Sequence, residues 1–168
     1  MNDPIPAPRV FANRAAAGVE LGRALKARSL KPPLTVLGLP RGGVAIAVPV
    51  AKALNRREQL YRAGLPPLDL NGRTAILVDD GLATGSTMLA AIRATRGARA
   101  ARIIAAAPVA SPAAAALIAR EADEVVFLET PPLFAISQWY EEFEQLDDAE
   151  VCRLLALARA SPETGPSR

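Results

Sequence analysis

The chain has 168 residues and a formal net charge of +3, and it is 51% hydrophobic but only 4% aromatic. This length and apolar content suit one α/β domain with a sizeable core and exclude a disordered chain. Histidine is absent and cysteine occurs once, which excludes internal disulfides, histidine-based triads and zinc sites. A metal would therefore be a hard cation bound by carboxylates, ligand phosphates and water, and we expect Mg²⁺.

The charge and hydropathy patterns limit location and partners. No apolar run is long enough to span a membrane, and the first ten residues lack a signal peptide's apolar core. We therefore expect a soluble, cytoplasmic protein without a membrane partner. The 20 basic residues are dispersed rather than arranged in a stripe. This suits a small phosphorylated ligand at least as well as RNA or DNA, and nucleic acid is the least favoured partner.

The N-terminal part predicts an extended lead-in and then a helix. Residues 1–12 contain three prolines, whereas residues 13–28 have helical periodicity with Asn13 as the N-cap. The apolar positions of this helix are Val19, Leu21 and Leu25. Arg14, in its first turn, could reach a bound phosphate, but a packing or salt-bridge role is favoured.

A first buried strand is predicted over residues 34–39, followed by a turn and a helix through Leu54. The turn consists of Pro40, Arg41, Gly42 and Gly43. Paired glycines let an anion approach the main chain, and Arg41 adds a fixed charge with a planar donor fork. The alternative is an ordinary strand–helix turn with a solvated arginine.

The stretch AILVDDGLATGSTM, residues 75–88, is the centre of the prediction. Its apolar run is typical of a strand buried on both faces, and it ends in Asp79 and Asp80. A turn of small and hydroxyl residues leads into a helix: Gly81, Leu82, Ala83, Thr84, Gly85, Ser86 and Thr87. This turn can direct N–H groups and hydroxyls at one anion, while the aspartates can accept hydrogen bonds from sugar hydroxyls. Together they indicate a phosphorylated ribose.

Other kinds of site also place acids after a buried strand. A Walker B site requires a GxxxxGK[ST] loop and a dinucleotide site a GxGxxG turn, and the chain contains neither. A phospho-acceptor domain and a purely structural junction are further alternatives. A structural junction would not need two adjacent aspartates.

The second half of the chain alternates strands with helices. Strands are predicted over residues 102–109 and 124–128, and Ser111 and Pro112 should start the helix between them. An aromatic-rich segment, residues 129–146, follows. Its aromatic residues are Phe134, Trp139, Tyr140 and Phe143. Packing against the end of the sheet is favoured for them over stacking on a base.

A last helix is predicted over residues 149–160, with Asp147 and Asp148 as caps and Cys152 on the core side. The tail, residues 161–168, is expected to be disordered. Residues 13–160 should then form one domain. Strands that alternate with helices predict a three-layer α/β/α fold, with about four core strands in a mainly parallel sheet and right-handed crossovers.

The motif VDDGLATGST resembles the phosphoribosyl pyrophosphate (PRPP) binding motif of type I phosphoribosyltransferases. Two further segments, FANRAAAGVELGRAL and ETPPLFAISQWYEEFEQL, resemble a bacterial phosphoribosyltransferase-like group. The resemblance implies that Asp79 and Asp80 are catalytic and bind the ribose hydroxyls, in part through Mg²⁺. It implies that the 5′-phosphate is bound by Ala83, Thr84, Gly85, Ser86 and Thr87, and the pyrophosphate by Arg41, Gly42 and Gly43.

The segment Asn55–Gly72 departs from the family pattern. Relatives carry there an edge hairpin and a long flexible loop that closes over the ligand. This chain has one short basic piece, predicted to be helical to Gly64, and a Pro66–Pro67 turn. A missing lid affects turnover more than binding, because the lid excludes water from a reactive sugar cation.

The resemblance implies a PRPP-dependent phosphoribosyltransferase that transfers ribose 5-phosphate to a nitrogenous base and releases pyrophosphate. Its partners would be PRPP and a small base or nucleotide, and a homo-oligomer is left open. The alternative is a catalytically weak PRPP- or nucleotide-binding regulatory module of the same fold. Enzymes for 6-oxopurines carry an aspartate where this chain has Ala83, so the base is not specified.

Overall fold

The computed structural model describes residues 10–54 and 69–160. Most of the expected lead-in lies outside the described residues, as do the short basic piece before Gly64 and the C-terminal tail. The elements are, in order, α1 (Arg14–Lys26), β1 (Leu34–Gly38), α2 (Gly42–Ala53), β2 (Thr74–Val78), α3 (Ser86–Gly97), β3 (Arg102–Val109), α4 (Pro112–Glu121), β4 (Glu124–Glu129), the 3₁₀ turn η1 (Ile136–Trp139) and α5 (Asp148–Ala160).

The strands form one four-stranded sheet in the order β1-β2-β3-β4, and each neighbouring pair is parallel. The predicted strands are confirmed. Their apolar runs form strands because β1, β2 and most of β3 are buried on both faces, as expected when helices cover both sides of a parallel sheet. The predicted three-layer α/β/α architecture is therefore confirmed.

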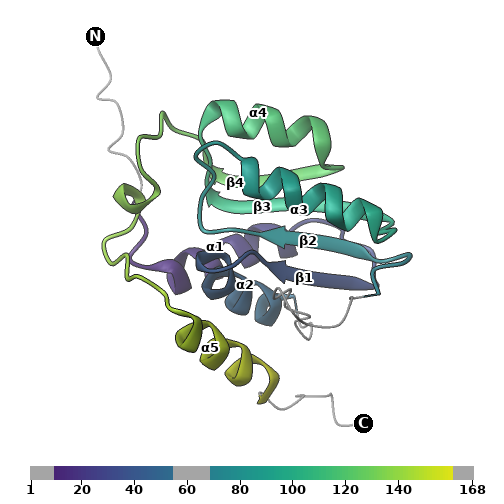
Figure 1. Ribbon diagram of the computed structural model, residues 1–168, viewed down its shortest axis with the longest axis horizontal. Coiled ribbons are helices and arrows are strands. Elements are labelled where there is room, and N and C mark those ends of the chain that lie inside the picture. Colours follow the sequence, from purple (N-terminus) through teal and green to yellow (C-terminus); the bar gives the residue numbers. More distant parts are fainter. Residues whose placement is uncertain (1–9, 55–68, 161–168) are drawn as a thin grey trace.

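Helices α1 and α2 lie on one face of the sheet and α3 and α4 on the other (Figure 1). Because side chains alternate along a strand, Val36 and Ile76 face α1 and α2, whereas Leu37 and Leu77 face α3 and α4. Two hydrophobic cores therefore flank the sheet.

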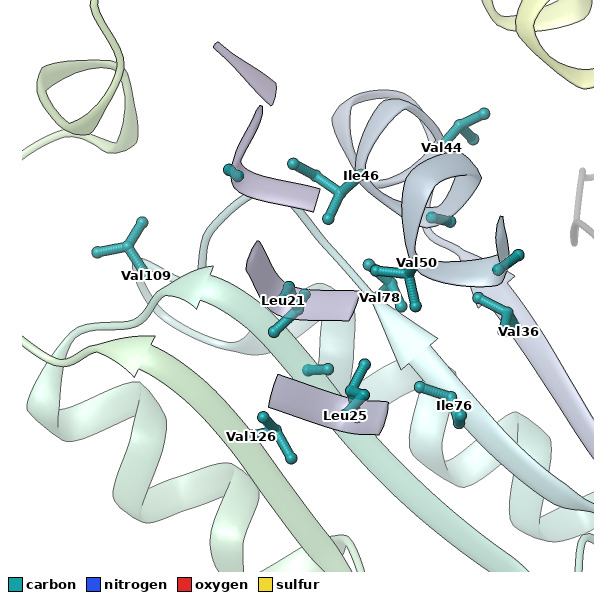
Figure 2. Packing of buried hydrophobic residues seen from close by; sticks show 14 of the residues in the cluster. Leu21, Leu25, Val36, Val44, Ile46, Val50, Ile76, Val78, Val109 and Val126 are labelled. Atoms are coloured by element: carbon teal, nitrogen blue, oxygen red, sulfur yellow. The ribbon is translucent and has the colours of Figure 1, made fainter. Parts of the chain in front are cut away.

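The first core joins both ends of the chain to the sheet. Leu21 and Leu25 of α1 and Val50 of α2 gather over Ile76 and Val126 (Figure 2). Helix α5 adds to this side by packing against α2. Helix α1 packs against β3 and β4, and α2 packs against β1 and β2, so the N-terminal helix and α5 are part of one layer that covers this face of the sheet.

Helix α2 lies on the opposite face of the sheet from α3 and α4, although the chain crosses the sheet one strand at a time. Part of the connection from α2 to β2 lies outside the described residues. The expected right-handed crossovers therefore stay a prediction for this connection.

The predicted helix starts are confirmed by their caps. Asn13, Ser111 and Asp147 each accept a hydrogen bond from the backbone N–H three residues later. Asp148 is the first residue of α5 rather than a second cap. Each cap satisfies one of the amides that a helix leaves unpaired at its start.

Two apolar positions of the helices are exposed, and one of them, Cys152, was predicted on the core side. Val19 is 41% exposed, because the buried stripe of α1 passes through Leu21 and Leu25, four residues apart. Cys152 is exposed as well, since Val151 and Leu155 form the buried stripe of α5. Successive residues turn by about 100° around a helix, which carries Cys152 out of the core.

Among the described residues, no helix combines the length and the apolar character that a membrane-spanning segment needs.

The packing of α1 on α2 generates a stability prediction. A Cβ at Gly18 would overlap the Pro49 ring and lie 2.6 Å from the backbone oxygen of Ile46. We expect Gly18→Ala to lower the free energy of unfolding by about 1–3 kcal/mol, because the helices must separate. The measurement is urea denaturation.

The matched control is Gly97→Ala in α3, where an added Cβ would meet no atom within 4 Å. Alanine has the higher helix propensity, so this substitution should leave stability unchanged or raise it by up to about 1 kcal/mol. Equal effects at Gly18 and Gly97 would contradict the proposed close packing.

Candidate active site

The two predicted ligand-binding turns meet at the carboxyl ends of adjacent strands. Gly38 of β1 lies in register with Val78 of β2, and the amide of Leu39 donates a 2.8 Å hydrogen bond to the Val78 carbonyl. From there, α2 and α3 leave toward opposite faces of the sheet. Diverging helices after adjacent strands form the crevice in which open α/β sheets bind ligands.

The paired glycines of the first turn allow this close approach. A Cβ at Gly42 would overlap the Asp80 carboxylate, and one at Gly43 would overlap the Val78 carbonyl oxygen. Both positions therefore require glycine for contact with the acidic pair. The neighbour at Gly42 is a carboxylate of the chain itself, and the approach of a bound anion to these glycines stays a prediction.

Arg41 lies at the outer side of the same turn. The peptide bond between Pro40 and Arg41 is cis. The Arg41 side chain is 60% exposed, and its Nε lies 3.3 Å from a carboxylate oxygen of Asp148, the first residue of α5. An ion pair this exposed contributes little to stability, so the guanidinium is available to an anion at small cost.

The second turn is anchored to the strand and helix that follow α3. The amide of Leu82 donates to the Val109 carbonyl at 2.9 Å, and the amide of Ser111 donates to the Leu82 carbonyl at 2.8 Å. The Ser111 hydroxyl donates to the carbonyl of Ala83 at 2.7 Å while capping α4. The same serine thus caps a helix and holds the loop, and the sequence predicted only the cap.

Gly85 provides the left-handed backbone that turns the loop into α3, with φ of 79°. The hydroxyls of Thr84 and Ser86 lie 2.9 Å apart on the exposed side. The first backbone bond of the helix runs from Leu89 to the Gly85 carbonyl, so the amides of Thr87 and Met88 precede the hydrogen-bonded ladder. Hydroxyls and helix-start amides therefore gather at one point, which is an arrangement suited to a phosphate.

Asp79 and Asp80 form a partly buried acidic pair. The amide of Asp80 donates to Asp79 Oδ1 at 2.9 Å. Burial raises the pKa of Asp79 well above its usual value, and the charge of the adjacent Asp80 carboxylate adds to the shift. A cation bound beside this pair would oppose both causes.

Arg14 contacts the acidic pair directly, which the sequence did not predict. Its Nε donates to Asp80 Oδ2 at 2.9 Å, and its Nη1 donates to the Glu144 carbonyl at 2.7 Å. The favoured salt-bridge role is confirmed, but the partner is one of the predicted catalytic acids. The sequence around Arg14 did not indicate this partner, because nothing in it shows that α1 begins beside the end of β2.

The aromatic residues divide into buried and exposed ones. Trp139 and Tyr140 are buried, which confirms the favoured packing role, whereas Phe134 is 91% exposed. The Tyr140 hydroxyl donates to the backbone carbonyl of Asp80 at 2.6 Å. Burial, with a further contribution from the Asp80 charge, raises the pKa of Tyr140, so the hydroxyl keeps its proton and remains a donor.

The residues fit a magnesium ion that arrives with its ligand. No group of three or more potential ligand side chains is found in the described parts of the chain, so a dedicated protein cage is absent there. Mg²⁺ commonly binds through one or two carboxylates together with substrate oxygens and water. The adjacent carboxylates of Asp79 and Asp80 supply that donor set, and the assignment of Mg²⁺ stays a prediction.

The raised pKa of Asp79 predicts how stability depends on pH. The folded chain retains a proton that the unfolded chain releases, so stability from the neutral carboxyl is lost as pH rises from about 3.8 through the higher folded pKa. Asp79→Asn keeps an acceptor for the Asp80 amide but cannot ionise. The variant should therefore be more stable than the unchanged protein at neutral pH.

The measurement is urea denaturation of both proteins between about pH 4 and about pH 8. The titrating groups outside the acidic pair are shared, so the difference in unfolding free energy reports the titration of the interacting Asp79–Asp80 pair. We expect that difference to grow in favour of the variant as the pH rises. A difference that shrinks or stays constant would contradict the raised pKa.

Comparison with known proteins places this site in a family. The model of the phosphoribosyl transferase domain matches residues 17–138. Protein Rv0571c of Mycobacterium tuberculosis strain H37Rv, provisionally named a phosphoribosyl transferase, is 31% identical over 207 residues. That alignment covers 88% of this chain and 46% of the relative, so the chain spans about half the length of this curated protein.

Solved structures have the same architecture. TT1426 from Thermus thermophilus is similar with a TM-score of 0.78 and 28% identity, over 87% of this chain and 97% of that one. Purine phosphoribosyltransferase from Pyrococcus horikoshii gives a TM-score of 0.56 at 22% identity, over 80% of this chain and 93% of that one. The second likeness shows the fold alone. Because the family match covers all four strands and both turns, this chain belongs to the phosphoribosyl transferase domain family.

Proposed function

We propose that this domain binds PRPP across its two turns and transfers ribose 5-phosphate to a nitrogenous base, releasing pyrophosphate. The observation that carries the proposal is the contact of the Gly42–Gly43 main chain with the Asp79–Asp80 pair. This contact places three features side by side at the carboxyl ends of β1 and β2. They are the glycine turn, the acid pair and the start of α3. PRPP carries pyrophosphate, ribose hydroxyls and a 5′-phosphate in the corresponding order.

The 5′-phosphate is assigned to residues 83–87. Thr84 and Ser86 contribute adjacent hydroxyls, and the start of α3 contributes unpaired amides and the positive end of its dipole. Ser111 holds the loop through the Ala83 carbonyl, so the site needs little ordering when the ligand binds.

The ribose and the pyrophosphate are assigned to the acid pair and the first turn. Asp79 and Asp80 would accept hydrogen bonds from the ribose hydroxyls and would hold Mg²⁺. The ion would neutralise charge on the departing pyrophosphate. Arg41, with Gly42 and Gly43, would face the pyrophosphate with an exposed guanidinium and close main chain.

The reaction is a displacement at the anomeric carbon. The bond from that carbon to the pyrophosphate oxygen breaks with its electron pair leaving on pyrophosphate, and a nitrogen of the base forms the new bond. Positive charge develops on the ribose, which the adjacent carboxylates stabilise electrostatically. No protein nucleophile is needed, and binding PRPP at both ends supplies positioning.

The acceptor base is left open. The position that carries an aspartate in 6-oxopurine enzymes is Ala83, so one base-assisting group is absent. The solved structures with similar folds include a purine and an orotate phosphoribosyltransferase, the latter from Aeropyrum pernix with a TM-score of 0.51 and 26% identity. These names support a nitrogenous base as the acceptor class without selecting one.

A second candidate is a PRPP- or nucleotide-binding module with weak or no turnover. The connection from α2 to β2 comprises only residues 54–73, which is short for the edge hairpin and flexible loop of the resembled family. The aligned stretch of the M. tuberculosis relative, 207 residues, is also longer than this whole chain. A shortened lid region favours binding over transfer.

Calorimetric titration with PRPP and Mg²⁺, followed by a pyrophosphate-release assay over a panel of bases, tests both candidates. We expect PRPP to bind and at least one base to trigger pyrophosphate release. Binding without release from any base would favour the binding module. Absence of PRPP binding would refute both candidates.

Asp80→Asn is expected to weaken PRPP binding at least about tenfold, because a charged hydrogen-bond acceptor contributes about 1.5–3 kcal/mol. The matched control is Asp123→Asn, which alters an exposed acid paired with Arg96 at 2.9 Å, away from the turns. Circular dichroism should show that both variants fold. Unchanged PRPP affinity in Asp80→Asn would refute the assignment of this carboxylate to the ribose.

A further inference from the structure

Arg14 is held by contacts with three separate groups. Its Nε donates to Asp80 Oδ2 at 2.9 Å, and its Nη1 donates to the Glu144 carbonyl at 2.7 Å. The guanidinium carbon lies 3.9 Å from the centroid of the Phe143 ring, within the range of a cation–π contact. The planar fork of arginine can make these contacts together, whereas a lysine ammonium cannot reproduce their geometry.

The ion pair differs from the other arginine pairs of the described chain in its burial. The side chains of Arg14 and Asp80 are 11% and 13% exposed, whereas the arginines in the other pairs are at least 41% exposed. Exposed pairs are screened and contribute little. A partly buried pair with fixed geometry is costly to break, because the remaining charge loses its partner.

The contacts around Asp80 restrict its position from several sides. The main chain of Gly42 lies against its carboxylate, and the Tyr140 hydroxyl binds its backbone carbonyl at 2.6 Å. The ring of Tyr140 in turn lies 5.3 Å from that of Phe143, which supports Arg14. Residues that lie far apart in the sequence thus contact the side chain or the backbone of Asp80.

The ion pair orients that carboxylate through one of its two oxygens. Arg14 donates to Oδ2 at 2.9 Å, and the neighbouring Asp79 carboxyl hydrogen-bonds the same Asp80 side chain. An acid that must accept a bond from a ribose hydroxyl needs a defined orientation. Arg14 supplies that orientation from the side of α1.

We propose that Arg14 is a positioning residue for the ribose site, which fixes the orientation in which the Asp80 carboxylate meets the ligand by binding its Oδ2. This inference rests on the proposed function and adds the N-terminal helix and the segment around Phe143 to the site. Arg14 touches no reacting atom, and its effect on PRPP passes through Asp80.

The test is calorimetric titration of PRPP with Mg²⁺ into the full chain and its Arg14 variants. We expect Arg14→Gln to raise the Kd about tenfold, as expected for loss of a charged hydrogen bond. Arg14→Lys keeps the charge but not the geometry, so its Kd should also rise, to between those of the unchanged protein and Arg14→Gln. A purely structural role would lower the urea midpoint and leave the Kd of the folded protein unchanged.

The matched control is Arg28→Gln. Arg28 follows the end of α1 and forms a 2.6 Å ion pair with Glu124, which this substitution removes. Its Kd should stay within about twofold of the unchanged protein, because an exposed pair contributes little. Phe143→Leu is a second variant that keeps the ion pair but removes the ring beneath the guanidinium. Its Kd should rise less than that of Arg14→Gln, and it keeps the test valid where Arg14→Gln does not fold.

The outcomes separate this inference from the proposed function. PRPP binding by the unchanged protein, with weakened binding in the Arg14 and Phe143 variants, supports both. Unchanged affinity in those variants overturns the positioning role alone, and so does tighter binding, which would mean that Arg14 competes with the ligand for Asp80. Failure of the unchanged protein to bind PRPP overturns the proposed function and this inference with it.

Discussion

The close approach of the Gly42–Gly43 main chain to the Asp79–Asp80 pair is the contact on which the site depends. It requires β1 and β2 to be parallel neighbours in register, so that both turns leave the sheet at the same level. It requires glycine, because a Cβ at either position would overlap the acidic turn or the end of β2. It also requires α2 and α3 to diverge to opposite faces, since helices on one face would fill the space between the turns. A change in any of these features would separate the two walls of the site.

This arrangement has an electrostatic cost. Two adjacent carboxylates in a partly buried position repel each other, and the result is the raised pKa of Asp79. Arg14 and Tyr140 offset part of this cost at Asp80, through an ion pair to its carboxylate and a hydrogen bond to its carbonyl. Asp79 accepts a hydrogen bond from the Asp80 amide, and its raised pKa shows that the cost of burial remains at this residue. Side chains placed at a cost in stability are a common compromise in proteins that need a particular site.

The residues that would bind PRPP and the residues that would cover it belong to different segments of the chain. The turns that would bind phosphates and ribose follow β1 and β2 directly, and β2 and its loop are supported by β3 and α4. Residues 54–73 connect α2 to β2 and belong to neither turn. A shortened connection can therefore leave both turns in place while removing what would cover them. Under the proposed function, PRPP affinity and the rate of transfer would depend on different parts of the chain, and they call for independent measurements.

The sequence determined the strands, the turns and the family, because these depend on local patterns. Apolar runs predicted β1 to β4, hydroxyl and acidic side chains predicted the caps, and the spelling VDDGLATGST predicted the type of site. The tertiary structure decided which segments meet. Nothing local to Arg14 indicated that it pairs with Asp80, sixty-six residues away, or that Tyr140 binds the same residue. Cys152 was misplaced because an apolar residue near a helical stripe can lie on either side of it, and only the packed neighbour fixes which. The face of the sheet that α2 covers was also decided only by the packing of the helices.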